Sequence, residues 1–250
     1  MDQILGIDIG ATGTKGALID THTGILMSDR IKYPTPKPSV PDAIIDTAYK
    51  IVEDLNWEGK PVGIGFPAII KKGVVYSASN IDKQWLHYDG LKAFKRRFGT
   101  DEIVLLNDAD AAGVAEMSLG HGKGKGGVVI LVTIGTGIGT AVFNDGVLLP
   151  NTELGHLLYK KGVFEDYMAN SIRERDELSW KEWGKEVNVY LKHLEFLFSP
   201  DLILLSGGVS KKFAKFQKYI NIETPVQPAQ LLNNAGIIGV AMAANMKFGS

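Results

Sequence analysis

Asp8-Ile-Gly-Ala-Thr-Gly-Thr-Lys15 is a glycine- and threonine-rich loop between two apolar strands, and it is the key to the architecture of this 250-residue chain. A second copy follows half a chain later, at Thr133-Ile-Gly-Thr-Gly-Ile-Gly-Thr140. Each copy leads into a second strand and then a turn, at Asp20-Thr-His-Thr-Gly24 and Asn144-Asp-Gly146. This repeat of strand, loop, strand and turn predicts two related domains that face each other across a cleft.

The composition describes a globular chain with no general attraction to polyanions. Hydrophobic residues make up 45% of it, charged residues 22%, and the formal net charge is −1. This balance argues against nucleic acid or a membrane surface as a partner, so any anion site must be local. No apolar run approaches the ~20 residues that span a bilayer. The absence of cysteine and of a leader pattern favours a cytoplasmic protein.

Glycine and threonine in the two loops allow backbone N–H and hydroxyl groups to approach an anion closely, and phosphate is the leading candidate. Neither loop has the spacing of a Walker A motif or a dinucleotide fingerprint. The threonines could equally be ordinary strand-edge residues, and Lys15 could contact phosphate or lie exposed. The candidate phosphate-binding residues are Gly10, Thr12, Gly13, Thr14 and Lys15 in the first loop and Gly135, Thr136 and Gly137 in the second.

Asp8 is a charged residue at the end of an apolar strand. A carboxylate there can hold Mg²⁺, through water, where the ion bridges donor phosphates. The alternative is that Asp8 caps the turn.

Asn107 and Asp108 follow four apolar residues and precede a helix. Catalytic groups are commonly exposed at the carboxyl end of such a strand. Asp108 could accept a proton from an attacking hydroxyl, and Asn107 could orient that substrate. Alternatively Asp108 or Asp110 caps the helix, leaving the other carboxylate for chemistry.

Glu153 and His156 lie directly after the second hairpin and could hydrogen-bond to adjacent sugar hydroxyls. Taken alone, a single histidine is more often structural. The four tryptophans are expected to pack in the core or on the surface rather than to stack on a sugar. For Trp85, which lies near Asn80 and Asp82, both interpretations stay open. Outside the motifs, the spacing predicts paired strands at 16–19 and 24–27 and helices at 43–55, 91–98, 164–175, 180–198 and 235–246.

Four segments occur in an order that resembles the ROK family of sugar kinases. They are Asp8–Lys15, Leu106-Asn-Asp-Ala-Asp-Ala-Ala-Gly113, Thr133–Gly139 and Glu153-Leu-Gly-His156. The resemblance implies an actin/hexokinase-like α/β fold of two duplicated RNase H-like domains, with glucose in the cleft. We expect residues 1–112 to form the first domain, with the C-terminal helix packing back on it, and residues 113–250 to form the second.

The resemblance also implies roles. Asp108 becomes the general base for the sugar 6-hydroxyl, and Asp8 and the two loops become the Mg²⁺ and phosphate elements. Gly207 and Gly208 match a segment that lies near adenosine in ATP-using relatives. Glu165 is the best match to a second sugar-binding glutamate, although the spacing is shortened. The implied glucose-binding residues are Asn80, Asp82, Asn107, Asp108, Glu153, His156 and Glu165.

One difference from the usual ROK sequence indicates a particular branch of the family. Typical members carry a cysteine-rich zinc motif after Glu-x-Gly-His, and this chain has none, so no zinc is expected. The same loss is found in the polyphosphate-using glucokinase branch, which the segments Asn80–Trp85, Pro150–His156 and Ser206–Ser210 also resemble. The implied partners are glucose and polyphosphate or ATP, in a homodimer. The alternatives are a strictly ATP-dependent sugar kinase and, in another class, a non-catalytic sugar sensor.

Overall fold

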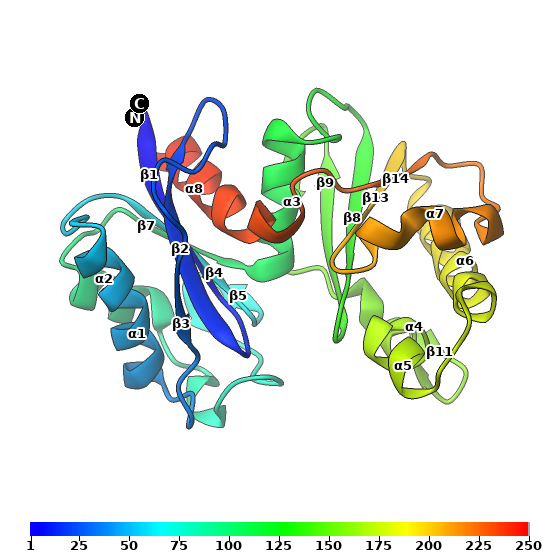
Figure 1. Cartoon of the computed structure of the whole chain (residues 1–250), viewed down its shortest axis with the longest axis horizontal. Helices are drawn as coiled ribbons and strands as arrows, with labels where there is room; N and C mark the ends of the chain where they lie inside the picture. Colours follow the sequence, from blue (N-terminus) through cyan, green and yellow to red (C-terminus); the bar gives the residue numbers. More distant parts are fainter. Residues whose placement is uncertain (250) are drawn as a thin grey trace. The chain divides into compact units, whose positions relative to one another are not determined.

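The computed structural model describes residues 1–249 and divides them into two compact units. Unit 1 comprises Met1–Leu119 together with the chain from Asn234 onward, and unit 2 comprises Gly120–Asn233. Figure 1 shows the elements of both units in the order of the chain. Within residues 1–249, no helix is both long enough and apolar enough to cross a membrane.

Unit 1 is built on a five-stranded sheet in the order β3-β2-β1-β4-β7. The first three strands of the chain run antiparallel to one another, and β4 and β7 run parallel to β1. The strands are β1 (Gln3–Ile9), β2 (Gly13–Asp20), β3 (Ile31–Pro34), β4 (Val62–Phe66) and β7 (Ile103–Asn107). A small hairpin, β5 (Ile70–Lys71) with β6 (Val74–Val75), and a 3-10 turn at Lys83–Trp85 follow β4.

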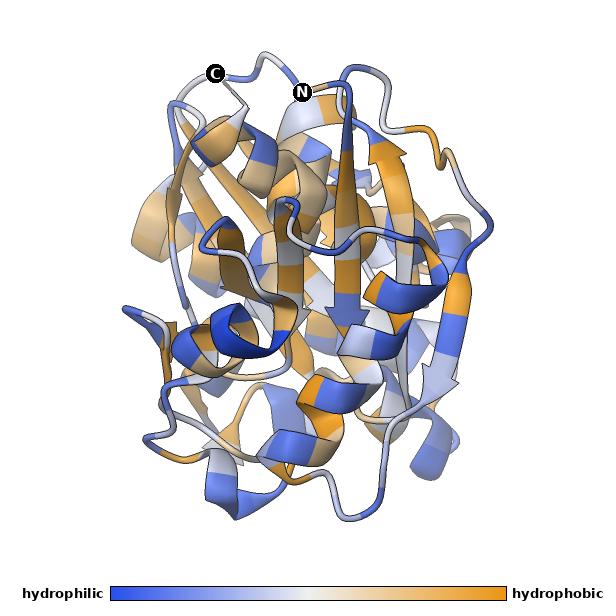
Figure 2. Cartoon of the chain, turned by 90° about the vertical axis from the view of Figure 1, so that its left-hand side faces the viewer, coloured by the Kyte–Doolittle hydropathy of each residue, from blue (hydrophilic) through white to orange (hydrophobic). Residues whose placement is uncertain are grey.

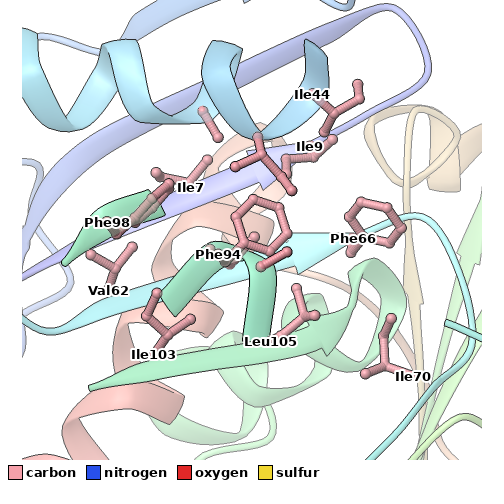
Figure 3. Packing of buried hydrophobic residues seen from close by; sticks show 14 of the residues in the cluster. Ile7, Ile9, Ile44, Val62, Phe66, Ile70, Phe94, Phe98, Ile103 and Leu105 are labelled. Carbon is pink, nitrogen blue, oxygen red and sulfur yellow. The ribbon is translucent and has the colours of Figure 1, made fainter. Parts of the chain in front are cut away.

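One face of this sheet is covered by α1 (Pro41–Asp54) and α2 (Gly90–Phe98). Helix α1 begins with proline at its first position, where no backbone N–H is needed, and buries Ile44, Ala48 and Ile51. Figure 3 shows Ile44 of α1 and Phe94 of α2 directed toward the apolar side chains of the strands. The core of unit 1 therefore lies between the sheet and these two helices.

The opposite face is covered by α3 (Asp108–Leu119) and α8 (Ala235–Phe248). Helix α8 lies very close to β4, because a Cβ atom on Gly63 would collide with the backbone of Val240. The last helix of the chain thus completes unit 1.

Unit 2 repeats the same arrangement, with a five-stranded sheet in the order β10-β9-β8-β13-β14. Its first three strands are antiparallel, and β13 and β14 continue in parallel from β8. The strands are β8 (Val128–Ile134), β9 (Ile138–Asn144), β10 (Val147–Leu149), β13 (Leu202–Ser206) and β14 (Val226–Pro228), with a small hairpin of β11 (Leu158–Tyr159) and β12 (Gly162–Val163). The duplication predicted from the two loops is therefore present in the strand order and direction.

Helix α6 (Trp180–Phe198) forms the main cover of the unit 2 core and has the predicted bounds. It begins with a capping box, in which Ser179 and Glu182 each satisfy a backbone N–H of the other. The shorter helices are α4 (Glu165–Met168), α5 (Asn170–Arg175) and α7 (Phe213–Phe216), with 3-10 turns at Leu154–His156, Ser210–Lys212, Gln217–Tyr219 and Leu232–Asn234. In Figure 2 the strands are mostly apolar along their length, whereas the helices alternate between apolar and polar residues.

Two local predictions are wrong. Residues 24–27 do not form a strand; only Leu26 makes an isolated bridge with Ile19, and the third strand of the sheet is Ile31–Pro34. The helix predicted over 164–175 is two helices, because the backbone of Ala169 is extended (ψ 149°) and separates α4 from α5.

Candidate active site

The first glycine loop joins β1 to β2 at the carboxyl end of β1. The Gly10 N–H donates to the Gly13 carbonyl oxygen at 3.0 Å, which closes the loop, and the Thr35 hydroxyl donates to the Gly10 carbonyl at 2.6 Å. Ala11 and Thr12 are exposed at its tip. The loop is thus held from both sides while its tip stays accessible to a ligand.

Asp8 pairs with Lys15 across the two strands, with 3.0 Å between Oδ2 and Nζ. Its side chain is only 16% exposed. A Cβ atom on Gly236, near the first residue of α8, would meet the Asp8 carboxylate at 2.7 Å, so the carboxylate sits against the start of that helix. The carboxylate therefore lies between the ammonium of Lys15 and the N-terminal end of α8.

Asn107 ends β7, and Asp108 opens α3. The side-chain oxygen of Asn107 accepts hydrogen bonds from the N–H groups of Ala109 (2.9 Å) and Asp110 (3.2 Å), while its amide donates to the Ala68 carbonyl at 3.2 Å. Asn107 is buried and caps the helix, whereas the Asp108 side chain is exposed. Asn107, which the sequence did not single out as a cap, therefore binds the first N–H groups of α3, and the Asp108 carboxylate also accepts from the Ala109 N–H at 2.9 Å.

The segment containing Asn80 and Asp82 also belongs to unit 1. Asn80 is exposed, and the Asp82 carboxylate accepts from the Gln84 N–H at 2.9 Å, capping the turn that carries Trp85. Trp85 is fully buried, donates to the Ser39 carbonyl at 2.9 Å and packs on Phe66. Trp85 is a core residue, as expected for the tryptophans in general.

The second glycine loop, in unit 2, repeats the closure of the first. The Gly135 N–H donates to the Gly137 carbonyl at 2.9 Å, and Thr136 is exposed at the tip. The Ser171 hydroxyl donates to the Thr136 carbonyl at 2.6 Å, which ties the loop to the start of α5. Both loops therefore present an exposed threonine on a closed backbone turn.

Glu153 and His156 lie beside each other, with 3.3 Å between Oε2 and Nδ1. Burial raises the pKa of the Glu153 carboxyl above its ordinary value, His156 opposes this rise, and the negative charge of Glu165 adds to it. Because its charge acts on Glu153, the Glu165 carboxylate lies close to the Glu153–His156 pair. Glu165 itself accepts from the Ile138 N–H at 2.6 Å, at the end of the second glycine loop.

Two contacts fix the Glu153–His156 turn on β9. The buried Thr140 hydroxyl donates to the Thr152 carbonyl at 2.6 Å and accepts from the Leu154 N–H at 3.2 Å. A Cβ atom on Gly155 would lie 2.7 Å from the Ile138 carbonyl oxygen, so only glycine allows the turn to lie flat on the strand. This explains the glycine between the two polar residues.

Gly207 and Gly208 follow β13, whose last residue Ser206 pairs with Thr133 of β8. A Cβ atom on Gly207 would collide with the backbone of Ile134, the residue that precedes the second glycine loop. The Gly207–Gly208 turn and the Gly135–Gly137 loop therefore lie side by side at one end of the unit 2 sheet.

The comparison with known proteins agrees with this geometry. The sequence profile described as the ROK family matches residues 4–168. The chain belongs to the ROK family. A polyphosphate glucokinase of Mycobacterium tuberculosis is 42% identical to this ROK protein over 239 residues, which cover 96% of the chain and 90% of the relative.

Solved ROK structures share the fold. The inorganic polyphosphate/ATP-glucomannokinase of Arthrobacter sp. strain KM matches 99% of this chain and 100% of its own, with a TM-score of 0.92 and 42% identity. A ROK glucokinase of Streptomyces griseus, in complex with glucose and AMPPNP, matches with a TM-score of 0.82 at 23% identity and covers 98% and 99% of the two chains. The actin/hexokinase-like α/β fold implied by the ROK resemblance is confirmed.

Within this ROK chain, the structure assigns some predicted residues to structural contacts. Thr14 is fully buried, and its hydroxyl has no hydrogen-bond partner among residues 1–249. Asn107 and Asp82 use their side chains as caps, and Glu165 binds the backbone of the second loop. The exposed candidates are Asn80, Asp108, His156, Thr12, Thr136 and Gly208.

Asp8 is the residue that the sequence predicts as a Mg²⁺ ligand. No group of three or more histidine, aspartate or glutamate side chains within the described part of the chain could hold an ion. Magnesium needs no such cage, because it commonly binds through one or two carboxylates together with substrate phosphates and water. The Asp8 carboxylate, which lies next to the first glycine loop, fits that requirement.

Proposed function

We propose that this chain transfers a phosphoryl group from inorganic polyphosphate, and also from ATP, to the 6-hydroxyl of glucose. The observation that carries the proposal is the 42% identity over 96% of the chain to a polyphosphate glucokinase. The site residues support it, since the exposed Asp108 carboxylate stands at a strand end, where a base for a hydroxyl is needed.

In the proposed reaction the glucose 6-oxygen attacks the terminal phosphorus while Asp108 accepts the hydroxyl proton. The bond between that phosphorus and the bridging oxygen breaks, and the shortened polyphosphate or ADP leaves with the electron pair. Phosphoryl transfer depends mainly on positioning and charge neutralisation. Thr12 and Thr136, each with the backbone of its own loop, are the proposed phosphate-binding residues.

Glu153 and His156 hold the sugar in this proposal. An ionised carboxylate accepts hydrogen bonds from hydroxyl groups, and the neighbouring imidazole can donate or accept another, so the pair suits two adjacent hydroxyls. The flat turn at Gly155 fixes their separation on β9. Asn80 is a further candidate, because it is exposed in the segment before the Asp82 cap.

Asp8 would hold a magnesium ion in this scheme, with Lys15 beside it. When bound, the ion would neutralise negative charge on the donor phosphates. Homodimer formation and a cytoplasmic location remain predictions, the first testable by light scattering on the purified protein.

The decisive experiment supplies long-chain polyphosphate or ATP as sole donor and measures glucose 6-phosphate. Turnover with polyphosphate supports the proposal. Turnover with ATP alone would favour the strictly ATP-dependent sugar kinase. Glucose binding without turnover on either donor would favour the sugar sensor.

A further inference from the structure

The chain between Asp201 and Glu223 carries four lysines and no acidic residue. Lys211, Lys212, Lys215 and Lys218 are all exposed, and within the described residues none of them lies within ion-pair distance of a carboxylate. Arg175, by contrast, binds Asp176 at 2.6 and 2.9 Å. These four lysines are therefore a concentrated positive charge, and we call them the lysine row.

The lysine row begins next to the proposed donor-binding loop. It follows directly from the Gly207–Gly208 turn, which packs against the strand residue before Gly135. Ser210 holds the connection in place, because its hydroxyl and its N–H both donate to the Gly207 carbonyl, at 2.8 and 3.2 Å. A ligand that extends beyond the Gly135–Gly137 loop on this side meets Lys211 and Lys212 first.

Aromatic contacts fix the next part of the row. The ammonium of Lys215 lies 5.7 Å from the ring centre of Trp180, and the guanidinium of Arg173 lies 4.3 Å from the same ring. Trp180 in turn stacks on Phe216 of α7, with 6.0 Å between ring centres and an interplanar angle of 14°. Helix α7 packs on α6 (Figure 1), so the row continues along a supported surface rather than a loose loop.

Arg173 links this cluster to the other side of the donor loop. It belongs to α5, which Ser171 ties to Thr136. Its side chain is only 19% exposed and also pairs with Glu174 at 3.3 Å, so it supports Trp180 rather than offering a free charge. The lysines are left as the accessible cations.

A row of cations without intervening carboxylates is suited to a linear polyanion. Each internal phosphate of polyphosphate is negatively charged, and binding several of them releases condensed counterions, which makes affinity depend on the number of contacts and on salt. A nucleotide triphosphate places its charges at the transferred end only. The distribution of the four lysines therefore matches an extended chain better than a nucleotide.

We propose that Lys211, Lys212, Lys215 and Lys218 bind the part of a polyphosphate chain that extends beyond the phosphates at the second glycine loop. This inference rests on the proposed use of polyphosphate as donor and adds the path of its distal segment. The site would act on affinity for long chains and not on the chemical step.

The test is a quadruple variant with Lys211, Lys212, Lys215 and Lys218 each replaced by glutamine. A matched control replaces four other exposed basic residues by glutamine: Lys92 and Arg96 of α2, and Lys123 and Lys125 of the loop before β8. It removes the same amount of positive charge from elsewhere in the chain. The KM for long polyphosphate, for tetraphosphate and for ATP is measured for each protein over a range of salt concentrations.

We expect the KM for long polyphosphate at low salt to be at least about tenfold higher in the quadruple variant than in the wild type. The slope of log KM against log salt concentration should fall by about one for each lysine that contacts phosphate. The values for tetraphosphate, ATP and glucose should stay near those of the wild type. Equal effects in the variant and its control would overturn the proposed role of the lysine row in binding polyphosphate, while leaving the donor assignment intact. A wild type that uses ATP but not polyphosphate would overturn both.

Discussion

The carboxylate of Glu165 accepts a hydrogen bond from the backbone N–H of Ile138 at 2.6 Å, where the second glycine loop enters β9. The same carboxylate is so close to Gly137 that a Cβ atom there would meet it at 2.5 Å. Glu165 also adds to the raised pKa of the Glu153 carboxyl. One side chain thus connects the proposed donor loop with the proposed sugar pair.

Replacing Glu165 by alanine should raise the KM for the phosphate donor by about tenfold or more, because a hydrogen bond to a charged group is lost from the loop backbone. Glu165→Gln should recover most of this loss, since an amide oxygen can accept the same bond. Asp166→Ala is the matched control; it removes a 3.0 Å bond to the Val163 N–H and leaves the loop alone. A selective rise in the KM for glucose would show instead that Glu165 contacts the sugar.

Asp108→Asn should lower kcat by about 10²- to 10⁴-fold, the usual contribution of a general base. Because the Asp108 side chain is exposed and Asn107 caps α3, the melting temperature and glucose affinity should stay close to those of the wild type. Asp101→Asn, on the exposed loop before β7, serves as the control. Near-normal turnover in the Asp108 variant would exclude it as the base.

The acid side of the pH profile should report Glu153. Its raised pKa means that the carboxyl takes up a proton at a higher pH than an ordinary glutamate, whose reference value is 4.5. As the pH falls, the KM for glucose should therefore rise earlier than an unperturbed carboxylate would cause, because the protonated form loses acceptor capacity for a sugar hydroxyl. In Glu153→Gln this limb should disappear; its persistence would point to another group.

Tyr190 offers a test of stability away from the site. It is fully buried on α6, its hydroxyl has no hydrogen-bond partner among the described residues, and burial raises its pKa. Tyr190→Phe should raise the free energy of unfolding by about 1 kcal/mol, since an unsatisfied buried hydroxyl is removed. Tyr159→Phe is the control and should be destabilising, because its hydroxyl donates to Glu186 at 2.9 Å. A loss of stability in Tyr190→Phe would indicate a bound water or another partner.

Periodicity and repeats predicted the main elements of the fold. The long apolar stripe predicted α6 at Trp180–Phe198, and the two glycine loops predicted the duplicated sheets. The third strand was misplaced because residues 24–27 are as apolar as a strand but pair only through Leu26. Strand pairing depends on partners far along the sequence, which local composition does not reveal.

The chemistry of the site was less predictable from residue types. Asparagine and aspartate at 107, 108 and 110 are equally good caps in sequence, and only the geometry shows that Asn107 takes this role. Thr14 resembles Thr12 in sequence, but its position inside β2 buries its side chain. Glu165 was predicted as a sugar ligand only from its position in the sequence after Glu153 and His156. Its hydrogen bond to the Ile138 N–H depends on α4 lying beside the second glycine loop.

Because α8 packs on unit 1 although it is the last helix of the chain, unit 1 can be completed only after unit 2 has been synthesised. Unit 2 is a continuous segment, Gly120–Asn233, and all of its strands are synthesised before α8 begins at Ala235. Since domains fold as units while the chain leaves the ribosome, we expect unit 2 to reach its final state first. Part of one face of the unit 1 sheet stays uncovered until α8 joins α3 there, and the environment of Asp8, which includes Gly236, is assembled last. We therefore expect the proposed Asp8 site to form only after the last helix has docked.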